Sequence, residues 1–429
     1  MAGVSSRRIT LVLLGVVPVA FLAWGLVGWS RRWPMGVDSS VYRAGAVLFL
    51  HRHSLYDVSN LGYLHLSFTY PPAAALLFSP LAALPTQLAW AVMAAVSILA
   101  LALAIRVAIA AVPDWRFPAA GSTLLLTAAV LCLVPVWRTI ALGQITIILM
   151  GLVVVDVLAV TARGSRWGGV LTGVAAAVFL VPLIFIPHLF LTGKRAASVR
   201  AIAVFAGLQG LTLLIAPREW AYWTSYVFKT HRIGAVQQPF NQSLDGMMAR
   251  VTNMAPWSAY VAWGIGAVLA VPALMLMLRY HRRGHDASAL CVTAFLGLLL
   301  APVSWLPSWV WIVPVIVVLV SWLQADWPRV DWRPGWKRWI GAGAVVGLIA
   351  VFTSTYSVPI SEQLHRTLSP TWFFVLSNPY VLTTIAVALV LGFDWRRAAD
   401  PSIDGSAART ADLPARAGQV LPAVRRQDP

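Results

Sequence analysis

The sequence has little charge, and acidic charge is especially scarce. Only 11% of its 429 residues are charged, and it has 15 Asp and Glu against 32 Lys and Arg. Soluble domains carry about 25% charged residues, so this composition excludes an ordinary soluble protein. Only two cysteines occur, Cys132 and Cys291, and both lie in apolar stretches. This excludes a disulfide framework and a cysteine-based metal site.

Apolar residues take the place of the missing charge. They make up 59% of the chain, and the mean hydropathy is +0.77. Several apolar runs have the length of about 20 residues that an α-helix needs to cross a bilayer. We therefore expect an all-α, polytopic integral membrane protein with about 11–12 transmembrane helices. The net charge of +17 then reflects arginines in the loops rather than a nucleic-acid partner.

The apolar stretches predict where the spans lie. They are found near 9–29, 86–110, 119–137, 141–162, 168–192, 201–216, 257–278, 287–304, 307–323, 339–357 and 371–393. No small-residue cleavage site follows the first stretch, so it is interpreted as an anchor rather than a signal peptide. The stretch 168–192 has basic residues on both flanks. We expect it to cross twice or to re-enter, with breaks at Pro182 and Pro187.

The distribution of basic residues predicts the orientation. With both termini in the cytoplasm, most of the 32 basic residues fall on the cytoplasmic side, as the positive-inside rule requires. Residues 1–393 would form the membrane domain, and residues 394–429 a disordered cytoplasmic tail. The outer face would carry a large first loop near 30–72 and further loops near 217–256 and 358–370. The acids placed on this face are Asp38, Asp57, Glu219, Asp245 and Glu362.

Acidic residues inside the predicted spans are nearly absent. Asp156 is the one clear case, and it lies near the cytoplasmic end of its span. Transporters driven by protons or ions need ionisable groups along their path, so a transporter or flippase is the disfavoured class. A carboxylate at the outer boundary suits a general base that activates a hydroxyl group. Asp38 is the best candidate, although most aspartates at such places are helix caps or surface acids.

A series of short motifs surrounds Asp38 and continues along the chain. In order they are Asp38-Ser39-Ser40-Val41-Tyr42-x-x-Gly45, Leu55-Tyr56, Phe68-Thr69-Tyr70-Pro71-Pro72, Leu142-Gly143-Gln144, the Pro182 region, Asn241-Gln242-Ser243-Leu244-x-Gly246, Ala301-Pro302-Val303-Ser304-Trp305 and Trp309-Val310-Trp311. In order and spacing they resemble the GT87-type polyprenyl-phosphate-mannose-dependent mannosyltransferases. These are GT-C-fold membrane glycosyltransferases of actinobacterial envelopes. The resemblance covers roughly residues 10–325.

The resemblance implies a fold and a reaction. The fold would be GT-C-like, with its active site on the outer face of the plasma membrane. Mannose would pass from polyprenyl-phosphate-mannose to a lipid-anchored mannoside, namely phosphatidylinositol mannoside, lipomannan or lipoarabinomannan, mostly in α-(1→2) linkage. Inversion at the sugar would need Asp38 as general base. The resemblance implies no cofactor besides the lipid-linked donor and no metal site, and it leaves open a need for divalent cations and the oligomeric state.

The same motifs supply candidates for binding donor or acceptor. They are Tyr42, Arg43, Tyr70, Pro71, Arg138, Gln144, Asn241, Gln242, Ser243 and Trp305. Each has a simpler alternative. The aromatic residues could belong to the interfacial belt that every bilayer protein carries, and Arg138 could extend its head group to the interface from a helix end. Arg43 is expected to orient Asp38. Asn241 also fits a glycosylation acceptor, and a polar turn is the preferred interpretation.

The chain departs from the family pattern in three places. Thr146 stands where Asn is usual, Phe179–Val181 where Lys is usual, and Pro307 and Ser308 where two histidines are usual. Lys and His are the groups expected to meet the donor phosphate. Other cations predicted on the outer face, Arg138 foremost, would have to replace them. The alternative is a catalytically divergent member that acts as a partner or lipid-binding subunit.

Overall fold

Helices dominate the structure. The computed structural model describes residues 2–32, 34–57, 61–64, 66–113, 115–229, 232–325, 336–354, 367 and 369–398. Within these residues the only β contacts are two isolated bridges, one between Leu61 and Leu66 and one between Asn241 and Trp305. The all-α class is therefore confirmed. The chain divides into two compact units, Met1–Ile385 and Ala386–Pro429, and the candidate site described below lies in the first.

Several helices have the properties of membrane spans. In the described part, four are long and apolar enough: α5 (Thr86–Ala111), α11 (Arg195–Ile215), α14 (Ser258–Arg282) and the segment Leu306–Gln324, which joins the 3₁₀-helix η6 (Leu306–Trp311) to α16 (Ile312–Ala325). Two bent pairs raise the number to six: α6 (Ala119–Val130) with α7 (Val134–Leu142), and α19 (Pro370–Ser377) with α20 (Pro379–Ala398). Shorter apolar helices cover Gly15–Ser30, Thr146–Thr161, Val181–Leu191 and Asp286–Leu300. The multi-pass prediction is confirmed, with several predicted spans present as bent or short helices.

The breaks fall partly where proline predicted them. In the stretch 168–192, α9 (Val170–Val178) ends and the 3₁₀-helix η2 (Val181–Ile184) begins with Pro182 in its first turn. The predicted break at Pro187 was wrong, because α10 runs through this residue. Pro187 lies in the first turn of α10 (Phe185–Leu191), where its missing N–H removes no intrahelical hydrogen bond. The bends of 78° between α6 and α7 and of 81° between α19 and α20 were not expected.

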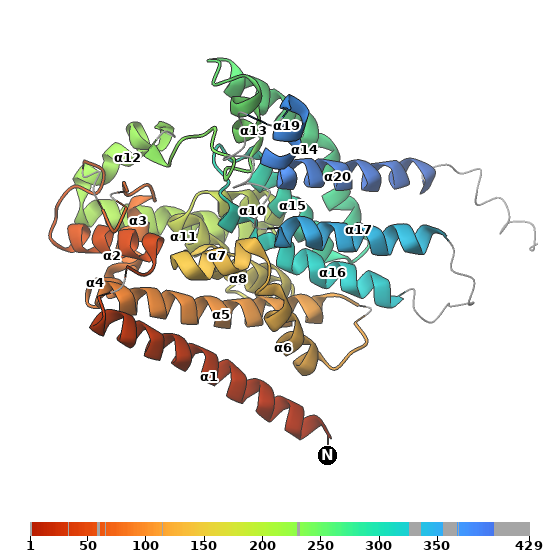
Figure 1. Cartoon of the computed structure of the whole chain (residues 1–429), viewed down its shortest axis with the longest axis horizontal. Coiled ribbons are helices and arrows are strands. Elements are labelled where there is room, and N and C mark those ends of the chain that lie inside the picture. Colours follow the sequence, from red (N-terminus) through yellow and green to blue (C-terminus); the bar gives the residue numbers. More distant parts are fainter. Residues whose placement is uncertain are drawn as a thin grey trace, which may run out of the picture. The chain divides into compact units, whose positions relative to one another are not determined.

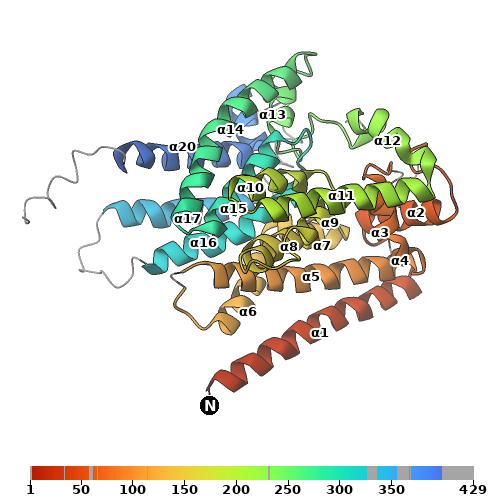
Figure 2. The same cartoon turned by 180° about the vertical axis from the view of Figure 1, so that it is seen from behind.

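The two long predicted loops are folded into short helices. The first contains α2 (Val37–Leu50), α3 (Pro72–Leu77) and α4 (Ser79–Ala82), and the second contains η3 (Pro217–Trp220), α12 (Ala221–Thr224), η4 (Tyr226–Phe228) and α13 (Leu244–Val251). Both views show α1 (Ala2–Ser30) running along α5, and α2, α3 and α12 gathered at one end of α5 and α11 (Figure 1, Figure 2). Glu362, His365 and residues 399–429 lie outside the described residues.

Asp156, the acid inside a predicted span, has a structural role. It begins the π-helix η1 (Asp156–Thr161), which continues α8 (Thr146–Val155), and it is fully buried. Its carboxylate accepts hydrogen bonds from the N–H groups of Gly169 and Thr172 at 2.8 and 2.7 Å and from the hydroxyl of Thr161 at 3.1 Å. Asp156 thus caps the start of α9, where free N–H groups and the helix dipole favour a negative charge.

We predict that Asp156→Ala lowers the free energy of unfolding by about 2–4 kcal/mol, because two buried backbone N–H groups lose their acceptor. Thr161→Val removes one hydroxyl hydrogen bond to the same carboxylate, and we expect a loss of about 1 kcal/mol. Unfolding in detergent micelles measures both. Equal stability of Asp156→Ala and the wild type would contradict the capping role.

Candidate active site

Asp38 lies in the first turn of α2. The helix begins after Gly36, whose φ of 69° is left-handed and favours glycine. The side chain is partly buried and forms no hydrogen bond or ion pair with any described residue, and it does not cap the helix. A carboxylate near a helix N-terminus is stabilised by the helix dipole. The helix therefore presents an Asp38 side chain that has no bonding partner among the described residues.

Trp90 of α5 packs against Gly36, before α2, and against Gly143, at the end of α7. Gly143 ends α7 with φ 64°, and a Cβ built there would lie 2.9 Å from the Cβ of Ser39 and 3.1 Å from the Trp90 ring. A Cβ on Gly36 would lie 2.6 Å from the same indole. The indole N–H also donates to the carbonyls of Ile140 and Ala141 at 3.0 and 3.1 Å. The start of α2 and the end of α7 are therefore in direct contact.

Two tyrosines connect the Asp38 helix to the turn that follows Gly143. Tyr42 is one helical turn after Asp38, so it lies on the same face of α2. Its buried hydroxyl accepts the Ile145 N–H at 3.4 Å and lies 2.9 Å from the Tyr70 hydroxyl. Burial, and after it the charge of Asp38, raises the pKa of Tyr70 above its ordinary value. Both phenols therefore remain protonated and can donate hydrogen bonds.

Arg138 is the cation that acts on Asp38. Burial raises the pKa of Asp38 to about 7, and the positive charge of Arg138 offsets part of this rise. The guanidinium lies 5.1 Å from the centre of the Phe240 ring, is partly exposed, and forms no ion pair with a described residue. Arg43, expected to orient Asp38, instead donates Nε to the carbonyl of Leu84 at 2.5 Å. Arg138 is thus close enough to influence the carboxylate without neutralising it.

The segment Asn241–Ser243 is fully buried, and its polar side chains form hydrogen bonds with backbone groups. Asn241 accepts the Ser304 N–H at 2.9 Å, and Ser243 donates to the Pro302 carbonyl at 3.1 Å. Gln242 accepts the N–H of Tyr380 at 3.1 Å and donates to the carbonyls of Pro239 and Ser377, both at 2.7 Å. These side chains hold the start of η6 and the break between α19 and α20 in place. The burial of Asn241 favours the polar turn over a glycosylation site.

The remaining candidates are placed around these groups. Pro71 is buried before α3, and Gln144 is buried and accepts the Thr146 hydroxyl at 3.0 Å. Trp305 is partly exposed and pairs with Asn241 in an isolated bridge. The structure therefore brings Asp38, Tyr42, Tyr70 and Arg138 together, whereas Arg43 is directed elsewhere. Among the described residues, no three His, Cys, Asp or Glu side chains are grouped to hold a metal ion.

Comparison with known proteins decides the family. The model of "Glycosyltransferase family 87" matches residues 68–302, more than half of the chain. The chain belongs to glycosyltransferase family 87. The family expected from the motifs is thereby confirmed.

Curated relatives match nearly the whole chain. One is a polyprenol-phosphate-mannose-dependent alpha-(1-2)-phosphatidylinositol mannoside mannosyltransferase of Mycobacterium tuberculosis, 30% identical over 399 residues, with 89% of each chain covered. A phosphatidylinositol pentamannoside mannosyltransferase of the same species, also polyprenol-phosphate-mannose-dependent, is 32% identical over 395 residues, 87% of this chain and 85% of the relative. Among solved structures, apo ArnT from Cupriavidus metallidurans matches 91% of this chain and 77% of its own, with 17% identity and a TM-score of 0.41.

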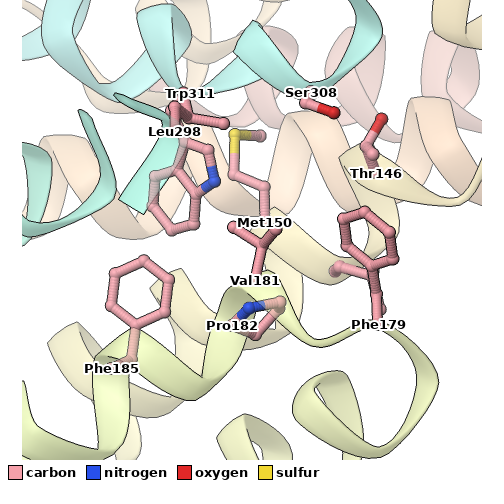
Figure 3. A pocket seen from close by; sticks show the side chains of 10 residues that line it. Thr146, Met150, Phe179, Val181, Pro182, Phe185, Leu298, Ser308 and Trp311 are labelled. Carbon is pink, nitrogen blue, oxygen red and sulfur yellow. The ribbon is translucent and has the colours of Figure 1, made fainter. Parts of the chain in front are cut away.

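The three departures of this family 87 member meet at one cavity. Thr146, Phe179, Val181 and Ser308 all line it, and the hydroxyls of Thr146 and Ser308 lie at the same end (Figure 3). Its volume of about 20 Å³ has room for about one water molecule. The other lining residues are Leu149, Met150, Pro182, Phe185, Leu298 and Trp311, so no lining side chain is charged. The Phe179 ring lies 5.8 Å from Tyr70, which places the cavity beside the Asp38 site.

Some residues of the site gave no signal in the sequence. Trp90 stands in a uniformly apolar stretch, where an aromatic residue has no distinguishing neighbour. Phe240 and Tyr380 act on Arg138 from positions more than 100 residues away. Long-range contacts of this kind have no sequence period that could reveal them. A scan for polar motifs alone therefore misses the apolar frame of the site.

We predict that Gly143→Ala lowers the free energy of unfolding by about 1–3 kcal/mol, because the new Cβ meets Ser39 and Trp90 at a left-handed φ. Gly121→Ala is the matched control. Gly121 is inside α6, and no atom lies within 4 Å of the place that an added methyl carbon would take, so alanine should not destabilise it. Thermal unfolding in detergent compares the two variants. The same loss of stability in both would contradict a specific contact at Gly143.

Proposed function

We propose that this chain transfers mannose from polyprenyl-phosphate-mannose to a lipid-anchored mannoside on the outer face of the plasma membrane. The observation that carries the proposal is the free carboxylate of Asp38, beside Arg138, in a family 87 chain. The activities for which the two mycobacterial relatives are named support both the donor and the acceptor class. Both termini would lie in the cytoplasm, with the acceptor a phosphatidylinositol mannoside, lipomannan or lipoarabinomannan.

Asp38 would act as general base. Its carboxylate takes the proton from an acceptor hydroxyl while the hydroxyl oxygen attacks the anomeric carbon of the donor mannose. The new glycosidic bond forms as the bond between that carbon and the phosphate oxygen breaks, and polyprenyl phosphate leaves with the bonding electrons. A single displacement converts a β-linked donor into an α-linked product. A base with a pKa near the working pH suits this task.

Arg138 would meet the leaving phosphate. Its guanidinium is partly exposed and unpaired within the described residues, and the planar group matches two phosphate oxygens. Arg138 acts on Asp38 without forming an ion pair with it, so the guanidinium remains available for the phosphate. The protonated Tyr70 hydroxyl is available to hold a sugar oxygen. The segment Asn241–Ser243 would position the site without touching substrate.

We predict that Asp38→Asn lowers kcat by about 10²–10⁴-fold, because the amide cannot accept the proton. The assay measures transfer of labelled mannose from polyprenyl-phosphate-mannose to a mannoside acceptor in membranes. Asp245→Asn is the control, since Asp245 lies in the first turn of α13 and carries no role in the reaction. Activity of Asp38→Asn equal to the wild type would refute the base assignment. Donor binding without transfer by the wild type would favour the lipid-binding subunit.

We also predict that kcat/KM rises with pH and levels off above an inflection near 7, because only ionised Asp38 accepts a proton.

Removal of the Arg138 charge takes away an effect that lowers the pKa of Asp38. The inflection of Arg138→Gln should therefore move to higher pH, together with a higher KM for the donor. Rates measured from about pH 5 to about pH 9 in one buffer series at constant ionic strength test this. An unchanged inflection in Arg138→Gln would show that its charge does not reach Asp38.

A further inference from the structure

Two cations share one aromatic ring in the second outer loop. The Lys229 ammonium lies 4.8 Å and the Arg232 guanidinium 4.6 Å from the centre of the Tyr226 ring. Tyr56 of the first loop stacks on the same ring at 5.1 Å. Like charges held close together repel each other, and a bound anion would relieve this repulsion. This group of Tyr226, Lys229 and Arg232 is called the Tyr226 cluster.

The acids near the Tyr226 cluster leave its cations available. Asp57 accepts the Tyr226 hydroxyl at 2.7 Å, and hydrogen bonds from Tyr226 and Ser54, with the charges of Arg232 and Arg218, lower its pKa. Neither Lys229 nor Arg232 forms an ion pair with an acid in the described ranges. The cluster is therefore only partly compensated, and Lys229 is exposed.

The cluster follows directly on a candidate membrane span. α11 ends at Ile215. Its last turn is apolar and exposed, and Leu214 is 82% exposed. Trp220 and Phe228, on the short helices that follow, are 57% and 77% exposed. Exposed aromatic rings beside cations are typical of segments that lie among lipid head groups, where cations meet phosphates. This loop is therefore placed to meet the head-group layer.

Hydrogen bonds join the cluster to the Asp38 site through Tyr56 and Tyr70. Arg232 donates to the Tyr56 carbonyl at 2.5 Å, and the Tyr56 hydroxyl donates to the Tyr70 carbonyl at 2.7 Å. The Tyr70 hydroxyl in turn lies beside that of Tyr42, on the face of α2 that carries Asp38. The cluster and the Asp38 helix are thus connected by a chain of contacts that runs through Tyr56, Tyr70 and Tyr42.

We propose that Lys229 and Arg232 bind the phosphodiester of an anionic phospholipid, and that this phospholipid is the acceptor. The inference rests on the proposed function and adds the site that holds the acceptor head group. The phosphodiester is the part of a glycolipid head group nearest the bilayer. Arg232 offers a planar pair of donors and Lys229 a mobile point charge, while the mannoside extends past Tyr56 and Tyr70 to Asp38.

Lys229→Glu tests the site with little risk to the fold, because the side chain is exposed and lies over the Tyr226 ring. With a phosphatidylinositol mannoside as acceptor, we expect its KM to rise about tenfold or more, the loss of a charge-assisted contact. With octyl α-mannoside, which has no phosphate, KM should stay within about twofold of the wild type. Lys229→Arg should restore the KM for the phospholipid. An equal rise for both acceptors would overturn the proposal.

Binding without donor separates this site from the proposed reaction. Head-group-labelled phosphatidylinositol is titrated into detergent-solubilised full-length protein. Lys229→Glu should weaken binding about tenfold, while Asp38→Asn and the exposed Arg283→Glu, at the end of α14, should bind as the wild type does. Unchanged binding in Lys229→Glu would refute the site even if mannose is transferred. Lys229-dependent binding by a wild type that transfers no mannose would refute the reaction and keep the site.

Discussion

The structure depends on one constraint: every helix break inside the protein frees backbone N–H and C=O groups that lipid cannot satisfy. Polar side chains are used for this purpose throughout the described part. Trp90 donates to the carbonyls at the end of α7. Gln242 donates to the Ser377 carbonyl and accepts the Tyr380 N–H at the break between α19 and α20. Asp156 accepts two backbone N–H groups at the start of α9. The polar residues of a membrane enzyme are therefore largely engaged before any substrate arrives.

The groups that remain unengaged are the ones to which we assign the proposed chemistry. Asp38 and Arg138 are the charged groups of the site that make no hydrogen bond or ion pair with described residues, although each influences the other. Their surroundings are held by the fully used groups, since Tyr42 is fixed by the Ile145 N–H and Gly143 by contact with Ser39. A rigid frame with two free charges is the arrangement that preorganised catalysis requires. The family 87 assignment and this geometry therefore agree.

The sequence predicted the parts of this structure that depend on local composition. Hydropathy is local and additive, so the apolar helices were found even where they are short or bent, and scarcity of acid drew attention to Asp38. Arg43 shows the limit: five residues turn a helix by roughly 140°, so it faces away from Asp38, whereas Tyr42 is only about 40° from it. Arg138 lies 100 positions away in the chain and was expected to meet phosphate rather than to act on Asp38. The bend at Asn378 falls directly before Pro379, yet hydropathy averaged over a whole span does not register a single proline.

The neutral cavity beside Tyr70 has a consequence for turnover. Since none of its lining side chains carries a charge, the cavity adds no second cation near a polyprenyl phosphate that Arg138 would hold. A single, partly exposed guanidinium holds a phosphate less tightly than a cluster of cations would. The spent lipid carrier would therefore leave readily and return to the bilayer. With few cations among its described residues, the site would bind the spent carrier weakly and would be less inhibited by this product.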